Sequence, residues 1–347
     1  MILQKKEILV HLEEKNLRLD KFLSKRFNSI SRQIWQRRIQ KGIVQVNDKI
    51  TKKSYLVKYN DKISFYYPKK SEPEIQTNFR IIYEDEYLIG IDKPPHLPIH
   101  PSGNYKKNTL NYLIKEYYKN TQENFYCHPI HRIDKETSGI VLYGKSPSFI
   151  NKMNQMFQNN QIHKKYYVLV FGKIEKEKVL EGYIGKDFFS KIKRKQRFIP
   201  KEKIKDFLNE FKGIHKSPDF VEIFFQNTYY KYRYCKTSFI PKKIKQISHF
   251  KYQFITLLEV EIFTGRLHQI RASLNSLKFP VVGDKIYGID ENYFLSYLED
   301  PKDFSKELLL NRTALHSYSL NFVHPISKRE LTLVSPLPED IQNRIEF

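Results

Sequence analysis

The chain has 347 residues, a length that fits about two domains with packed cores. Hydrophobic residues make up 40% and charged residues 29%, which is typical of folded rather than disordered chains. No run approaches the roughly 18 apolar residues that a membrane helix needs, and the charged N-terminus does not fit a signal peptide. Two cysteines exclude a disulfide framework or a four-cysteine zinc site, so we expect a soluble cytoplasmic protein.

Basic residues dominate the charge. Lys and Arg outnumber Asp and Glu by 61 to 38, a formal charge of +23 that attracts polyanions such as RNA or DNA. The only alanines are Ala272 and Ala314, which indicates a bias toward A- and T-rich codons. Such a bias would also raise the number of lysines without any functional reason. However, residues 1–80 hold 19 basic and 8 acidic residues, so charge is concentrated near the N-terminus. We therefore expect a nucleic-acid partner.

Two basic amphipathic helices are expected near the N-terminus. Apolar side chains in residues 18–27 fall at helical spacing and form one stripe. The next helix should begin after Ser31, a good N-cap, and end at Gly42, with Trp35 in the core. Basic side chains beside these stripes are candidates for RNA phosphate contacts, although a solvated face has the same pattern. They are Lys21, Lys25, Arg26, Arg32, Arg37, Arg38 and Lys41.

Short strands complete this first module. Val44 and Val46 alternate with polar residues, Asn47–Asp48 predicts a turn, and another strand is expected near residues 62–67. Prolines and mixed charges then mark a linker. We place a first domain at residues 1–70 with its core at about 16–67, a linker at 71–78, and a second domain at 79–347.

The second domain is expected to alternate strands and helices. Apolar runs at residues 87–91, 140–143 and 166–171 predict strands, and Ser146 followed by proline predicts the start of a helix. Residues 186–205 hold nine basic and two acidic residues with interleaved phenylalanines. Such a stretch can follow a nucleic-acid backbone and stack bases, or it can be a solvated loop.

Two clusters could carry chemistry. The first is His131–Gly139, which runs into an apolar segment and so places Asp134 at a strand or loop edge. Taken alone, Asp134 could equally be paired with a neighbouring basic residue. In the second cluster, which follows a predicted strand, Arg266 and Arg271 could bind phosphate or hold a carboxylate through two parallel hydrogen bonds.

Other kinds of site have weaker patterns. Cys127, His128 and His131 could suggest a metal, but no tight ligand set accompanies them. Asp134 and Glu136 could form a glycosidase carboxylate pair, although Glu136 is expected in solvent. The sequence has no glycine-rich phosphate loop, so neither nucleotide hydrolysis nor a nicotinamide cofactor is indicated.

Taken together, these segments resemble the RluA-type pseudouridine synthases. Residues 131–139 look like the family motif HRLDxxTSG, and residues 264–271 look like TGRTHQIR. The first module resembles the ribosomal-protein S-four-like RNA-binding domain that often precedes this catalytic domain. Further matching blocks follow in the family's order at residues 92–101, 164–172, 279–288 and 315–338.

The resemblance implies an α+β fold, with a mixed, mainly antiparallel sheet and flanking helices after a small α+β RNA-binding domain. It also implies isomerisation of specific uridines to pseudouridine in structured RNA, without a metal or cofactor. Asp134 would be the catalytic carboxylate, Tyr166 would stack on the base and take part in proton transfer, and Arg271 would pair with Asp134. Substrate contacts are expected from His131, Arg132, Thr137, Arg266, His268 and Ile270.

The target RNA is less constrained. A separate basic module favours large-subunit ribosomal RNA, with transfer RNA as the alternative. A non-catalytic RNA-binding ribosome-assembly factor, or a hydrolase that releases uracil, would be different functions of the same fold. We expect no membrane and no obligate protein partner. The chain departs from the family pattern at Leu267, at Pro95–His96, and at residues 200–232, which look like an insertion.

Overall fold

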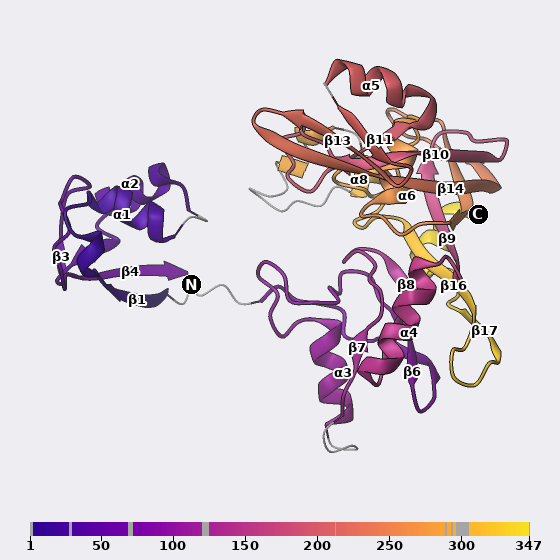
Figure 1. Ribbon diagram of the computed structural model, residues 1–347, viewed down its shortest axis with the longest axis horizontal. Coiled ribbons are helices and arrows are strands. Elements are labelled where there is room, and N and C mark those ends of the chain that lie inside the picture. The colour runs from indigo at the N-terminus through magenta and orange to yellow at the C-terminus, as the bar shows by residue number, and fades with distance from the viewer. Residues whose placement is uncertain are drawn as a thin grey trace. The chain divides into compact units, whose positions relative to one another are not determined.

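The computed structural model describes residues 3–27, 30–68, 72–119, 125–211, 213–288, 290–292, 294–295 and 305–346. The chain divides into two compact units, residues 1–71 and 72–347 (Figure 1). Within the described residues, no helix is both long enough and apolar enough to cross a membrane.

The N-terminal unit packs two helices on one small sheet. Its four strands lie in the order β1–β4–β2–β3, and each neighbouring pair is antiparallel. Both predicted helices are confirmed, and a turn of 3-10 helix precedes them. The elements are β1 (Leu3–Leu9), η1 (Leu12–Glu14), α1 (Leu19–Arg26), α2 (Arg32–Gln40), β2 (Val44–Val46), β3 (Lys49–Ile50) and β4 (Lys62–Pro68).

A single apolar core explains why this unit folds. Trp35 is completely buried, as predicted, and its ring lies 5.0 Å from that of Phe65 on β4 and 5.6 Å from that of Phe27. The turn at Asn47–Asp48 is confirmed, since both residues have positive φ, which suits a two-residue hairpin. It joins β2 to the short strand β3, which the sequence did not predict.

The second unit is built on a sheet of 13 strands among the described residues. Its main path is β11–β10–β14–β15–β9–β16–β8–β6–β5, and β7, β12, β13 and β17 pair at its sides. Every described pair is antiparallel except β8 with β16, so the mixed, mainly antiparallel fold is confirmed. The first strands are β5 (Arg80–Glu84), β6 (Leu88–Lys93), β7 (His128–Pro129), β8 (Ser138–Gly144), β9 (His163–Phe171) and β10 (Lys178–Lys186).

The later part of this unit adds further strands and a few helices, and four strands follow one another between residues 214 and 262 without the expected alternation. The remaining strands are β11 (Gln196–Pro200), β12 (Ile214–Ser217), β13 (Phe220–Phe225), β14 (Thr228–Gln246), β15 (Phe254–Ile262), β16 (Leu315–Val323) and β17 (Glu330–Val334). The helices are α3 (Leu110–Tyr118), α4 (Pro147–Gln158), η2 (Lys201–Lys203), α5 (Ile204–Glu210), α6 (Gln269–Ser276), α8 (Ser305–Leu308) and α9 (Glu339–Ile345).

Local signals account for several of these elements. Ser146 caps α4, because its hydroxyl accepts the backbone N–H of Phe149 at 3.3 Å, as the sequence predicted. The basic stretch at residues 186–205 is only partly a loop: residues 187–195 connect β10 to β11 and leave Phe189 55% exposed, and the rest contains β11 and the start of α5. Phe198 lies on β11 with only 5% of its surface exposed, so it packs in the core and cannot stack on a base.

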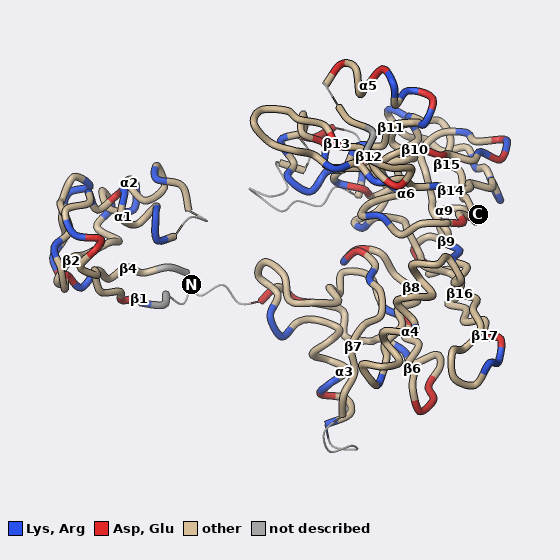
Figure 2. The backbone as a smooth tube through the Cα atoms, viewed as in Figure 1, with Lys and Arg blue, Asp and Glu red and all other residues tan. Residues whose placement is uncertain are grey.

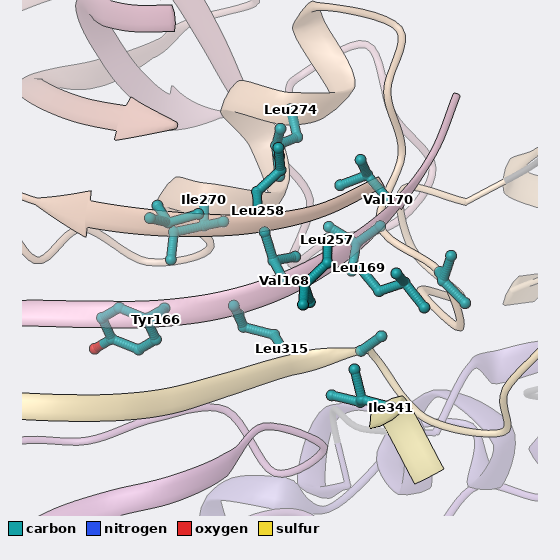
Figure 3. Close-up of a cluster of buried hydrophobic side chains, with 14 of the residues drawn as sticks. Tyr166, Val168, Leu169, Val170, Leu257, Leu258, Ile270, Leu274, Leu315 and Ile341 are labelled. Carbon is teal, nitrogen blue, oxygen red and sulfur yellow. The ribbon is translucent and has the colours of Figure 1, made fainter. Parts of the chain in front are cut away.

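The largest core cluster lies where β9 and β15 meet α6. Val168, Leu258 and Leu274 are completely buried there (Figure 3). Tyr166 stands at the edge of this cluster, with its hydroxyl turned away from the apolar side chains (Figure 3). This packing fixes the start of α6 against the central strands, and the start of α6 carries Arg271.

Candidate active site

A buried arginine between two carboxylates is the centre of the site. Arg271 lies in the first turn of α6, and its Nη1 donates to Asp134 Oδ2 at 2.7 Å. Its Nε and Nη2 donate to Asp284 Oδ2 and Oδ1 at 2.6 and 2.8 Å. Asp284 is completely buried and also accepts the backbone N–H groups of Ile286 and Tyr287 at 2.9 and 3.1 Å. Asp284 therefore fixes the guanidinium, and the guanidinium in turn orients Asp134.

Asp134 keeps its charge in this setting. Burial raises the pKa of its carboxyl, but the positive charge and hydrogen bond of Arg271 outweigh burial, so the pKa falls below its usual value. About a quarter of the Asp134 side chain stays exposed, at 26%, whereas the Asp284 side chain has 0% exposed. Of the two carboxylates that hold Arg271, Asp134 is therefore the one that a substrate can reach.

Tyr166 on β9 is close enough to Asp134 for the two groups to interact electrostatically. Burial is the main cause that raises the pKa of its phenol to about 12, and the negative charge of Asp134 adds to the rise. Tyr166 is 7% exposed and remains a neutral phenol at neutral pH. The site therefore places an ionised carboxylate beside a protonated hydroxyl.

The close approach of β8 to β16 brings these two residues together. Ser317 on β16 pairs with Gly139 on β8 and with Tyr166 on β9, so it lies between the two strands. Gly139 has φ +102°, and a Cβ there would lie 2.2 Å from the carbonyl oxygen of Ser317. Only glycine fits this position, which is five residues after Asp134 and sets where the loop carrying Asp134 enters β8.

His268 is the third predicted side chain beside Asp134. It has φ +55°, and its Nε2 lies 3.8 Å from Asp134 Oδ2 while its Nδ1 lies 3.0 Å from the Tyr287 hydroxyl. Burial, together with the charge of Arg271, lowers the pKa of the imidazole to about 4, so the ring is neutral at neutral pH. His268 can therefore exchange hydrogen bonds with Asp134 or a substrate without adding charge.

Other predicted contact residues lie in different surroundings. His131 accepts the backbone N–H of Leu142 at 3.1 Å, and burial lowers the pKa of its ring to about 3, so it holds the loop against β8. Ile270 is 5% exposed and packs in the core. Arg132 is exposed, whereas Thr137 is buried and its Oγ1 has no hydrogen-bond partner within the described part of the chain. Their roles as substrate contacts stay predictions.

Arg266 and the buried Lys93 complete the surroundings of the site. Arg266 is half-buried and donates from Nε to the carbonyl oxygen of Tyr234 at 3.1 Å. Lys93, which the sequence did not single out, is completely buried and donates to the carbonyl oxygens of Pro94 and Lys135 at 2.8 and 3.2 Å. Burial lowers the pKa of its amine to about 7. Lys93 thus ties the loop that carries Asp134 to the end of β6.

Glu136 was expected in solvent, and that expectation is wrong. It accepts hydrogen bonds from Lys285 Nζ at 2.9 Å and from the backbone N–H of Thr313 at 3.0 Å, so it anchors the loop rather than forming a carboxylate pair with Asp134. Among the described residues, no group of three His, Cys, Asp or Glu side chains is arranged to hold a metal.

Most of the predicted RNA-binding side chains of the N-terminal unit lie at its surface. Lys and Arg spread over both of its helices (Figure 2). Arg32 donates from Nε to the buried carboxylate of Asp20 at 3.0 Å, and Arg26 pairs with Glu14, so these two arginines also stabilise the unit. The exposed members are Lys21, Lys25, Arg32, Arg37 and Lys41, while Arg26 and Arg38 are half-buried.

Comparisons with known proteins agree with this geometry. Residues 87–276 match the RNA pseudouridylate synthase family, and residues 17–63 match the S4 domain. The chain is 28% identical to a ribosomal large subunit pseudouridine synthase D of Buchnera aphidicola subsp. Schizaphis graminum, over 94% of this chain and 92% of the relative. It is also 28% identical to an uncharacterized RNA pseudouridine synthase of Chlorobaculum parvum, over 95% of this chain and 93% of the relative.

A solved structure supports the fold. Human RNA pseudouridylate synthase domain containing 1 superposes with a TM-score of 0.52 at 18% identity, over 77% of this chain and 86% of that one. The chain therefore belongs to the RNA pseudouridylate synthase family. It is an RNA pseudouridine synthase, an isomerase, and its N-terminal unit is an RNA-binding S4 domain.

Proposed function

We propose that this enzyme isomerises specific uridines of large-subunit ribosomal RNA, with Asp134 as its catalytic carboxylate. The observation that carries the proposal is the ionised, partly exposed Asp134 held at 2.7 Å by a buried Arg271. Relatives named as ribosomal large subunit pseudouridine synthases C and D match more than nine-tenths of the chain and favour ribosomal RNA as the target. Transfer RNA is the alternative substrate.

The reaction needs few groups from the protein. The bond from ribose C1′ to uracil N1 breaks, and a bond from C1′ to C5 forms after the base has turned. N1 gains a proton and C5 loses one, so substrate and product are isomers. Asp134 can attack the ribose as a nucleophile or remove a ribose proton to give a glycal, because an ionised carboxylate suits both tasks.

The neighbours of Asp134 would then hold the detached base. Tyr166 offers a ring for stacking and a protonated hydroxyl for proton transfer, since its pKa lies at about 12. Arg271 keeps Asp134 ionised and oriented. Arg132 is exposed beside this site and can fill the gap in the RNA stack that a flipped uridine leaves, which offsets part of the few kcal/mol that flipping costs.

The Asp134→Asn variant tests this assignment. Asparagine keeps the shape and one acceptor for Arg271 but removes the charge, so we expect pseudouridine formation to be lost while RNA affinity is largely kept. The measurement is pseudouridine mapping of total RNA, by chemical labelling and primer-extension stops, in gene-deleted cells that carry either form. Normal modification with the variant would refute the role of Asp134, and lost sites in transfer RNA would correct the target.

A further inference from the structure

The segment at residues 200–232 includes a hairpin that packs against β10, β11 and α5. Strands β13 and β14 pair from Phe220 opposite Arg233 to Phe225 opposite Thr228, and the hairpin projects from its part of the sheet (Figure 1). One face is buried, because Val221, Ile223 and Tyr232 pack in the cluster that includes α5. The hairpin is therefore a rigid arm rather than a flexible loop.

The opposite face of this arm carries exposed aromatic rings and two basic side chains, together with one acidic residue, Glu222, opposite Lys231. Phe224 and Tyr229 are directly opposite each other near the tip, 47% and 71% exposed, with ring centroids 4.9 Å apart. Further back, Lys231 Nζ lies 3.3 Å from the centre of the Phe220 ring, and Arg233 is exposed. Within the described part of the chain, neither Lys231 nor Arg233 makes an ion pair.

This face leads back to the catalytic centre. Side chains alternate along a strand, so Tyr229, Lys231, Arg233 and Cys235 share one face of β14 over about 20 Å. Cys235 is buried in the same cluster as Ala272 of α6, the helix that begins beside Asp134. The row of exposed residues therefore runs from the hairpin tip toward the start of α6.

Basic side chains also lie between the hairpin and the start of α6. Burial lowers the pKa of Arg266, and the nearby charge of Arg233 adds to this effect, so the two guanidinium groups are close neighbours. Arg194, on the β10–β11 connection, is close enough to His268 to help lower its pKa. Residues 186–236 together hold fourteen Lys and Arg against six Asp and Glu. Glu222 opposite Lys231 and Asp219 near Arg266 balance only part of this positive charge, so an anionic chain on this face would compensate the remainder.

We propose that the exposed face of the β13–β14 hairpin binds the single-stranded RNA next to the target uridine, with bases stacked on Phe224 and Tyr229 and phosphates on Lys231 and Arg233. Exposed aromatic rings interleaved with cations are the usual surface for single-stranded RNA. This inference rests on the RNA-modifying function proposed above. The hairpin would contribute to RNA binding and would take no part in the chemistry at Asp134.

Paired variants test the stacking. In Phe224→Ser/Tyr229→Ser, we expect the Kd for a labelled oligouridine of about 12 nucleotides to rise about thirtyfold or more, since two stacking rings are removed. Ultraviolet crosslinking of the wild-type complex should give RNA adducts on Phe224 or Tyr229. Phe250→Ser is the control, since Phe250 is an exposed phenylalanine outside the hairpin, with 69% of its surface exposed against 47% for Phe224. Unchanged affinity in the paired variant, or crosslinks that avoid the hairpin, would overturn the proposal.

Charge and turnover give independent readouts. Lys231→Gln/Arg233→Gln keeps both exposed rings and should reduce the slope of log Kd against log salt by about 1.4, because each phosphate contact contributes about 0.7. Lys178→Gln removes an exposed charge outside the hairpin and should leave the slope unchanged.

On total RNA from gene-deleted cells, both paired variants should raise KM and keep kcat, whereas Asp134→Asn should lose kcat and keep affinity. A defect confined to ribosomal particles, absent with bare RNA, would mean that the hairpin contacts a protein and would refute the proposal.

Discussion

Replacement of Asp284 by asparagine removes one of the two charges that balance Arg271. The wild-type carboxylate accepts two hydrogen bonds from the guanidinium and two from backbone N–H groups, and it is completely buried. Asparagine has the same size but one acceptor oxygen, so its amide group must face Arg271 or the backbone donors. Breaking a buried pair in this way costs about 3–5 kcal/mol of unfolding free energy. We expect a loss of that size in Asp284→Asn.

Urea unfolding at pH 7 and single-turnover kinetics measure the two consequences. Arg271 loses its fixed orientation, so the rate of pseudouridine formation should fall about tenfold or more while RNA affinity stays the same. Asp340→Asn is the matched control, because Asp340 also holds a buried arginine, Arg312, through two bonds of 2.6 Å, but 41% of its side chain is exposed. Water can replace that carboxylate, so the control should lose only about 1 kcal/mol.

The pH dependence follows from the direction of the shift. Burial raises the pKa of Asp284, but Arg271 and the backbone N–H groups lower it further, so the folded-state pKa lies below the unfolded value. The stability that Asp284 contributes is therefore full above the unfolded pKa of about 3.9 and is lost as pH falls through the folded value. Equal stability of wild type and Asp284→Asn at pH 7 would refute the assignment of Asp284 as the group that fixes Arg271.

Three further outcomes are expected. Tyr166→Phe keeps the ring and loses the hydroxyl, so kcat should fall about 10²- to 10⁴-fold with little change in KM; a change in KM alone would contradict a role in proton transfer. The pKa of Asp134 is lowered and that of His268 is about 4, so kcat/KM should show no acid limb above about pH 5, and a midpoint near pH 6 would contradict the assignment. Trp35→Ala should lower the unfolding free energy of the N-terminal unit by about 3–5 kcal/mol, as measured by thermal unfolding. It should also weaken RNA binding, as measured by fluorescence anisotropy, and unchanged RNA affinity would contradict a role of that unit in binding.

Local patterns in the sequence predicted the elements where one physical signal dominates. The helix after Ser146 was predictable because its cap and first-turn proline act over three residues. The core position of Trp35 was predictable because helical spacing sets which side faces the sheet. The phenylalanine at position 198 was misinterpreted, since the surrounding lysines and arginines suggested a surface loop, whereas both faces of β11 are covered and Phe198 and Ile199 are both buried. Charge density along a strand does not reveal which side chains point into the core.

The active site depends on contacts between residues that are far apart in the sequence. Asp134 and Arg271 are 137 positions apart, and only the resemblance to a known family paired them, because no spacing rule connects a loop before β8 with a helix after β15. Asp284 was present in a matching block but carried no local sign of burial. Its importance comes from the four donors that surround it in the fold.

The residues that hold the catalytic carboxylate are separate from those proposed to bind the RNA strand. Arg271 can hold Asp134 only because Asp284 supplies a second buried charge, so all three residues must stay together for the carboxylate to remain ionised and oriented. The β13–β14 hairpin shares none of these contacts, and its exposed face can change without disturbing the carboxylates. With RNA bound on this face as proposed, a change in the hairpin can alter which RNA strand is held near Asp134 while the chemistry there stays the same.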